Sequence, residues 1–223
     1  MSNPRPIVIA CPTVIEEMQP LLPAGFKTRV LDFGLHVNPD RLRTTLQRAI
    51  DEAAKEADTI ILGYGLCANA VVGLVPSNST LVIPRVDDCI AIFLGSTAAY
   101  REQSQKVPGT YYLTKGWIEV GDTPFEEHKR LVDKYGKQRA DRMIALMLKN
   151  YTRLAYIDTG QADQKGYRRY ARRTAEQFNL RYEEISGSRA LVRKMIHGPW
   201  DDDFIVVRPG QTVELTDFSI ACP

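Results

Sequence analysis

Three of the four cysteines in the sequence stand just beyond short apolar runs that are typical of buried strands. They are Cys11 after residues 7–10, Cys67 after residues 59–62 and a glycine-containing turn, and Cys89 after residues 80–83 and a polar loop. In a parallel sheet the carboxyl ends of the strands lie on one edge, where ligands bind. Cysteines far apart in the sequence are therefore expected to converge at one site.

Metal binding is the chemistry that three such thiols predict. Helix N-termini that follow the strands would lower the thiol pKa values and favour the ligating thiolates. Zn²⁺ with three protein ligands keeps one open, catalytic position, and a [4Fe-4S] cluster on three cysteines leaves one iron open to substrate. The sequence contains no CxxC pair, which argues against a zinc ribbon or a thioredoxin motif. The competing interpretation is that these cysteines are ordinary buried side chains.

Tyr64 and His36 are the candidate catalytic residues for moving a proton. Tyr64 lies three positions before Cys67, and His36 follows the second expected strand, so both fall on the same edge. For His36 the sequence leaves three roles open, namely a fourth ligand, an acid/base and a loop histidine. Cys222 is expected to lie apart in the terminal tail, and the alternative is a fourth ligand supplied by that tail.

Arg85, Lys115 and Asp88 are the candidate substrate-binding residues. Arg85 follows the fourth expected strand and Lys115 the fifth, so both cations are expected to reach the metal site. Two cations beside a thiolate-bound metal favour a small anionic or thiol-bearing ligand. The alternative for Arg85 is a structural ion pair with Asp87 or Asp88.

Two short polar segments in the second half stand between an expected strand and an expected helix. They are residues 158–160 (Asp-Thr-Gly) and residues 186–188 (Ser-Gly-Ser). Small residues before a helix N-terminus make an anion site, but ordinary caps and turns explain them at least as well.

The composition is that of an ordinary water-soluble globular protein. The chain has 223 residues, of which 44% are hydrophobic and 25% charged, and its net charge is +2. This charge gives no electrostatic indication of nucleic-acid binding. Neither a signal peptide nor a membrane-spanning stretch is evident, so we expect a cytoplasmic protein without a membrane partner.

Expected strands and helices alternate along the whole chain, which predicts an α/β fold with parallel sheets. An amphipathic helix after Asn38 and a helical stretch at about residues 125–149 are the clearest helices. We expect two Rossmann-like parallel-sheet units that face each other across a cleft. Their expected bounds are residues 1–120, which carry the three cysteines, and residues 121–223.

Several segments of the chain resemble a family of uncharacterised bacterial and archaeal proteins, domain of unknown function 1638 (DUF1638). The segments are IACP, LHVNP, GYGLC, PRVDDCIAIFLGS, PGTYYLTKGW and, more loosely, YIDTG. The resemblance implies that Cys11, Cys67 and Cys89 match cysteines of the family. Some members carry a histidine where this chain has Asp88, which puts any mechanism that needs this histidine in doubt. The resemblance also implies a link to corrinoid-dependent methyl transfer, through an association of genes.

Together these features predict a metalloenzyme of corrinoid-linked one-carbon or thiol metabolism. Such an enzyme would transfer a methyl group to a thiol or a small anionic substrate, with a corrinoid supplied by a partner protein. One alternative is a [4Fe-4S]-dependent lyase or desulfurase, in which the open iron takes a leaving group. Another is a non-catalytic accessory protein that handles a metal or a corrinoid.

Overall fold

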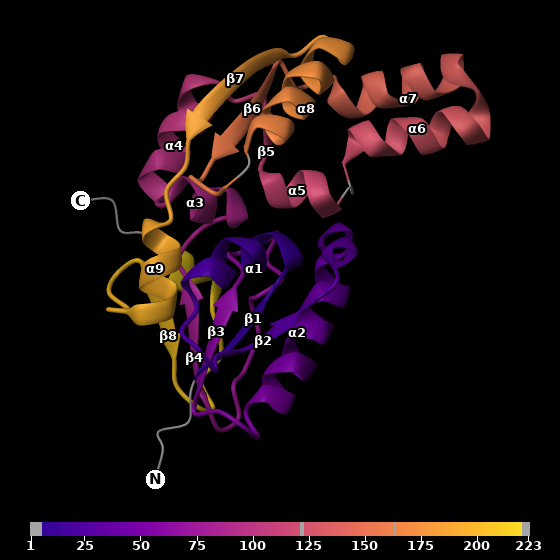
Figure 1. The fold of residues 1–223 in the computed structure, drawn as a ribbon. Helices are drawn as coiled ribbons and strands as arrows, with labels where there is room; N and C mark the ends of the chain where they lie inside the picture. The colour runs from indigo at the N-terminus through magenta and orange to yellow at the C-terminus, as the bar shows by residue number, and fades with distance from the viewer. Residues whose placement is uncertain (1–5, 121–122, 163, 220–223) are drawn as a thin grey trace. The chain divides into compact units, whose positions relative to one another are not determined.

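The computed structural model describes residues 6–120, 123–162 and 164–219. The chain divides into two compact units, the first formed by Met1–Ala99 with Ser188–Pro223 and the second by Tyr100–Gly187. Each unit contains its own sheet, and each is described by itself (Figure 1).

The sheet of the first unit has five strands in the order β2-β1-β3-β4-β8. The strands are β1 (Ile7–Ala10), β2 (Lys27–Val30), β3 (Thr59–Gly63), β4 (Thr80–Pro84) and β8 (Phe204–Val207). The first four are parallel, and β8 pairs antiparallel with β4. Strands β1, β3 and β4 are almost entirely buried because helices cover both faces of this sheet.

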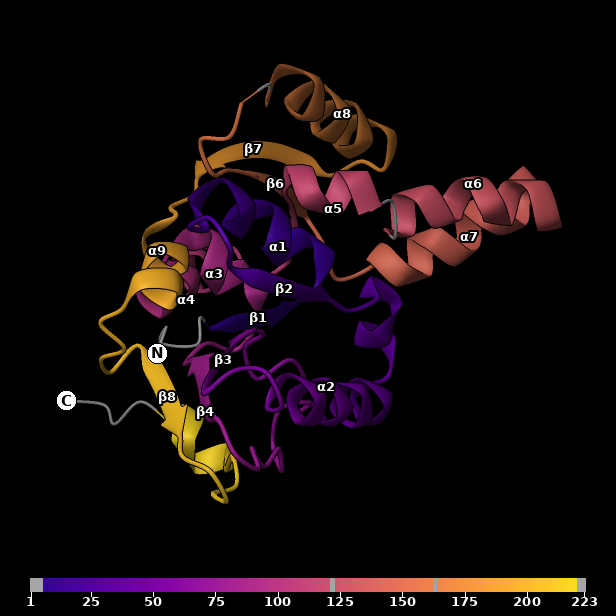
Figure 2. The same ribbon diagram turned by 60° about the horizontal axis from the view of Figure 1, so that its bottom comes forward.

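Helix α2 lies on one face of this sheet, and α1 and α9 lie on the other (Figure 2). The helical elements of the unit are α1 (Pro12–Met18), η1 (Gln19–Leu21), η2 (Phe33–Val37), α2 (Pro39–Ala53), α3 (Cys89–Leu94), α9 (Ala190–His197) and η3 (Leu215–Phe218). The expected amphipathic helix is confirmed as α2, in which Leu42, Leu46 and Ile50 are buried. Asn38 caps this helix, because its side chain accepts a hydrogen bond from the Arg41 amide.

The second unit has a three-stranded parallel sheet in the order β5-β6-β7. Its strands are β5 (Thr110–Leu113), β6 (Arg153–Asp158) and β7 (Arg181–Ser186). Its helices are α5 (Lys115–Val120), α6 (Pro124–Tyr135), α7 (Lys137–Leu148) and α8 (Gln164–Gln177), and α4 (Thr97–Lys106) leads into it from the first unit. Helices α6 and α7 form a hairpin around Gly136, where one continuous helical stretch was expected.

The α/β fold and the parallel-rich sheets are confirmed, but the strands are distributed differently from the expectation. We expected β5 in the domain of residues 1–120, and it pairs with β6 in the second sheet. We expected β8 in the domain of residues 121–223, and it completes the first sheet beside β4. The reason is that hydrophobic periodicity identifies a strand but not the strand with which it pairs. The cleft between two Rossmann-like units stays a prediction.

None of the helices in the described residues is long and apolar enough to cross a membrane.

Candidate functional site: three thiols at one sheet edge

The three cysteines follow three neighbouring strands of the first sheet. Cys11 comes directly after β1 and is the N-cap residue of α1, and Cys89 is the first residue of α3. Cys67 lies four positions after β3, which is hydrogen-bonded to both β1 and β4. Because these strands are parallel, all three cysteines leave the sheet at its carboxyl edge, as the sequence predicted.

The loop after β3 is held against the loop after β4 by backbone hydrogen bonds. The Leu66 amide donates to the Val86 carbonyl at 2.8 Å, and the Cys67 amide donates to the Asp87 carbonyl at 2.9 Å. A Cβ atom at Gly65 would lie 2.5 Å from the Val86 carbonyl oxygen, so only glycine permits this approach. The contact carries Cys67 to the loop that leads into Cys89.

The backbone at Cys67 is strained. Cys67, Ala68 and Asn69 have consecutive φ angles of 46°, 54° and 67°, in the left-handed region. This conformation costs a non-glycine residue roughly 1–2 kcal/mol. Such strain persists only where the surrounding structure imposes it, and it is concentrated at functional sites.

The three thiols influence one another electrostatically. Burial is the main reason why the pKa of each thiol lies above its ordinary value. The pKa of Cys67 is raised to about 12. Repulsion from Cys11 raises the pKa of both Cys67 and Cys89, and Cys67 raises that of Cys89 further. The Cys11 sulfur lies 3.1 Å from the Thr13 hydroxyl oxygen. The thiols are therefore protonated near neutral pH, and a bound cation would relieve the repulsion between their thiolates.

Tyr64 is buried beside the three cysteines. It is 1% exposed, and its hydroxyl group has no hydrogen-bond partner within residues 6–120, 123–162 and 164–219. Burial raises the pKa of Tyr64 far above its usual range, and the negative charges of Cys11, Cys67 and Cys89 would raise it further. Tyr64 is therefore a neutral hydrogen-bond donor at this edge and not a base.

His36 stacks on Tyr64. Their ring centroids are 5.8 Å apart, with an angle of 28° between the ring planes. The His36 Nδ1 atom lies 2.8 Å from the Phe33 carbonyl oxygen. Because a carbonyl oxygen only accepts, Nδ1 carries a proton, and in the neutral ring the lone pair is then on Nε2. This tautomer suits a proton acceptor or a metal ligand.

Arg85 and Asp88 flank Cys89, but each makes a specific structural contact. An Nη atom of Arg85 donates to the Phe204 carbonyl at 3.3 Å, and its Nε atom is buried without a hydrogen-bond partner. The Asp88 carboxylate accepts from the Ile90 amide at 2.8 Å and caps α3. The role of Asp88 as a cap was not predicted, although an Asp at the start of a helix is the usual signal for one.

Lys115 belongs to the second unit, so its expected place beside the cysteines stays a prediction. It is the first residue of α5, and its Nζ atom donates to the Gln161 side-chain oxygen at 3.3 Å. It also pairs with Glu119 at 3.8 Å. Cys222, whose role as a fourth ligand was left open, lies outside the described residues.

No group of three or more His, Cys, Asp or Glu side chains in residues 6–120, 123–162 and 164–219 is arranged to hold a metal ion. The donor set nevertheless suits a soft cation, since thiolates are soft ligands. To bind one ion, the sulfur atoms would have to lose their protons and approach one another.

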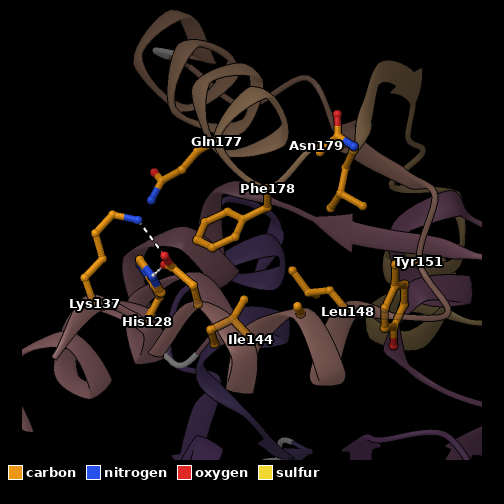
Figure 3. Close-up of a pocket in the computed structure, with 11 residues that line it drawn as sticks. His128, Lys137, Ile144, Leu148, Tyr151, Gln177, Phe178 and Asn179 are labelled. Atoms are coloured by element: carbon orange, nitrogen blue, oxygen red, sulfur yellow. Dashed lines mark hydrogen bonds and ion pairs between the residues drawn. The ribbon is translucent and has the colours of Figure 1, made fainter. Parts of the chain in front are cut away.

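A cavity of about 610 Å³ lies in the second unit, between the α6–α7 hairpin and the end of α8 (Figure 3). Ile144, Leu148 and Phe178 form its apolar part, as Figure 3 shows. At its polar end the His128 Nε2 atom lies 2.8 Å from an Asp141 carboxylate oxygen, and Lys137 bonds to the same carboxylate at 2.5 Å.

The sequence did not predict this arrangement. The His128 side chain is only 12% exposed, although it belongs to a helix. The signal that could have revealed it is Gly136, because a glycine with a φ of 77° ends α6 and folds α7 back along it.

Comparison with known proteins identifies the family of the chain. A model of the family described as "Protein of unknown function (DUF1638)" matches residues 30–196. No curated protein matches the chain, and no solved structure does. The match covers about three quarters of the sequence and includes Cys67, Cys89, Tyr64 and His36. The chain therefore belongs to the DUF1638 family.

Proposed function

We propose that Cys11, Cys67 and Cys89 bind one soft metal centre, either Zn²⁺ or a [4Fe-4S] cluster, at the carboxyl edge of the first sheet. The observation that carries this proposal is that the three cysteines follow three neighbouring parallel strands and leave the sheet at one edge. Cysteines scattered through the core would not share one sheet edge. A metal would supply a Lewis acid that activates a substrate thiol or takes a leaving group.

The residues around the thiols have distinct roles in this proposal. His36 accepts the proton of the incoming substrate at Nε2, since Nδ1 is already committed to the Phe33 carbonyl. Tyr64 donates a hydrogen bond from its neutral hydroxyl to the substrate, because burial keeps that hydroxyl protonated and unpaired. The stacking between the two rings fixes the position of His36 relative to this donor.

The substrate we propose is a small anion or an anionic thiol. The buried Nε atom of Arg85 has no hydrogen-bond partner, and an unpaired buried donor of a cationic group favours an anionic ligand. The family resemblance implies an association with genes for corrinoid-dependent methyl transfer. We therefore propose to test first whether a methyl group passes from a corrinoid to such a thiol. Loss of methylcobalamin absorbance in the presence of mercaptoacetate measures it.

Metal analysis of the anaerobically purified protein tests the site. We expect about one zinc per chain in a colourless protein, or iron and sulfide in a brown one. Each of Cys11→Ala, Cys67→Ala and Cys89→Ala should abolish metal retention, whereas Cys222→Ala, the matched control, should retain it. A wild-type protein that binds neither zinc nor a reconstituted cluster would refute the proposal.

Arg85→Ala separates substrate binding from metal binding. We expect this variant to keep its metal and to bind mercaptoacetate more weakly, because Arg cannot itself be a ligand. If Arg85 instead only braces β8 through the Phe204 carbonyl, the variant should lose thermal stability and metal together.

A further inference from the structure

A second polar cavity lies at the carboxyl end of β6 in the second unit. It measures about 550 Å³ and is lined by Asp158, Gly160, Gln161, Gln164, Lys165 and Arg168. The residues come from the end of a parallel strand and from the first turns of α8, a helix of 14 residues. This is the position at which parallel α/β sheets bind ligands, and the N-terminus of a helix attracts negative charge.

Gln164 gives an independent indication that a ligand is bound there. It is 7% exposed, and its amide nitrogen is buried without a hydrogen-bond partner among the residues that the structure describes. The amide oxygen accepts from the hydroxyl of Tyr156, which is fully buried in β6. Tyr156 therefore fixes the orientation of the amide of Gln164, which lines the cavity, and leaves the two N–H groups of this amide unpaired. A buried donor without a partner is costly unless a ligand satisfies it.

Lys165 is the charged residue of the cavity that could attract an anion. Lys165 is exposed and, among the described residues, forms no ion pair or hydrogen bond. Lys115 donates to the side-chain oxygen of Gln161, and its charge is compensated by Glu119. Among the described residues of the wall, the acidic one is Asp158, which shares Arg168 with Glu184 and accepts a hydrogen bond from the Gly160 amide.

Gly160 leaves room for the anion. Its φ angle is 75°, and a Cβ atom built on it would meet no other atom within 4 Å. From these observations we propose that the start of α8 is a binding site for the phosphate or carboxylate group of a small molecule. The Gln164 amide, Lys165 and the helix N-terminus would hold this group. The site is in the second unit and does not rest on the cysteines, so the metal proposal can fail without affecting it.

Titration of the ¹⁵N-labelled full-length protein with inorganic phosphate, and separately with acetate, tests the site directly. We expect saturable shifts of the Gln164 side-chain amide and the Gly160 backbone amide in nuclear magnetic resonance spectra. Binding of phosphate alone identifies a phosphate group and binding of acetate alone a carboxylate, and either supports the proposal. If neither anion gives a saturable shift at millimolar concentrations, the proposal is wrong.

Three variants test the residues, with folding checked by circular dichroism. Gln164→Glu keeps the oxygen that accepts from Tyr156 but replaces the donor by a carboxylate, so it should weaken anion binding at least about tenfold. Lys165→Gln, at an exposed position, should weaken binding by a smaller factor. Arg169→Gln removes the same charge four residues further along α8 from Lys165 and should bind as the wild type does. The proposal is overturned if Gln164→Glu and Lys165→Gln bind as tightly as the wild type, or if Arg169→Gln weakens binding equally.

Discussion

Replacing Tyr64 by Phe should stabilise the metal-free protein, although the same change at a partnered tyrosine destabilises a protein. The Tyr64 ring is 1% exposed, and its hydroxyl has no hydrogen-bond partner. An unpaired buried polar group costs roughly 1–3 kcal/mol, and Phe removes the group without leaving a cavity. We take the lower end and expect the free energy of unfolding to rise by about 1 kcal/mol, which raises the melting temperature by about 4 °C.

Urea and thermal denaturation of chelator-treated protein measure this effect. The matched control is Tyr170→Phe, because the Tyr170 hydroxyl donates to Glu126 at 2.6 Å, and its loss should lower the stability by about 1 kcal/mol. In the functional assay we expect the opposite order, with Tyr64→Phe impaired in substrate binding and Tyr170→Phe unaffected. If Tyr64→Phe lowers the stability of the metal-free protein by as much as the control does, the hydroxyl is a structural group and our reasoning fails.

Gly65→Ala should destabilise the protein by about 1–3 kcal/mol in urea denaturation, because its methyl group would lie 2.5 Å from the Val86 carbonyl oxygen. Gly166→Ala, at a helical position with no atom near the added methyl group, should instead stabilise it by about 0.5–1 kcal/mol; equal effects would contradict this account. Arg153→Met should cost about 3 kcal/mol at pH 7, since the fully buried Arg153 loses three hydrogen bonds, including one to Glu183 at 3.0 Å. The hydrogen bond from Arg153 lowers the pKa of Glu183 in the folded protein. The stabilisation that this hydrogen bond gives is therefore fully present above about pH 4.5 and is lost as the pH falls through the folded-state pKa. The difference between wild type and Arg153→Met should therefore shrink between pH 5 and pH 3, and a constant difference would exclude this linkage.

The sequence predicted the positions of the buried strands β1, β3 and β4 well, because each is a short apolar run bounded by residues that break a strand. Strand β2 (KTRV) is not such a run, and it lies at Lys27–Val30, earlier than the expected second strand. It also predicted that Cys11, Cys67 and Cys89 leave the sheet at one edge, since that follows from the parallel order of β1, β3 and β4. The proximity of His36 to the same edge followed from the same rule, and its stacking on Tyr64 agrees with it.

The pairing of strands and helices far apart in the sequence was not predictable in the same way. An apolar run such as 204–207 has the same pattern whether it pairs parallel or antiparallel, and only its alignment with β4 decides. The contact of His128 with Asp141 depends on the reversal at Gly136, and hydrophobic periodicity alone does not predict that two helices fold back on each other. Tyr64, Arg85 and Gln164 each have a buried donor atom without a hydrogen-bond partner among the described residues. Whether a donor has a partner depends on the tertiary structure around it, so a local sequence pattern cannot predict it.

The antiparallel pairing of β8 with β4 has a consequence for folding during synthesis. The first sheet needs residues 204–207, whereas every strand of the second sheet lies within residues 110–186. A ribosome therefore releases the whole second sheet before the last strand of the first one emerges. Until then β4 remains an open edge with unpaired backbone groups beside the loop that carries Cys89. On this order of events the strands that carry the three cysteines emerge first, and the strand that covers the β4 edge of the same sheet emerges last.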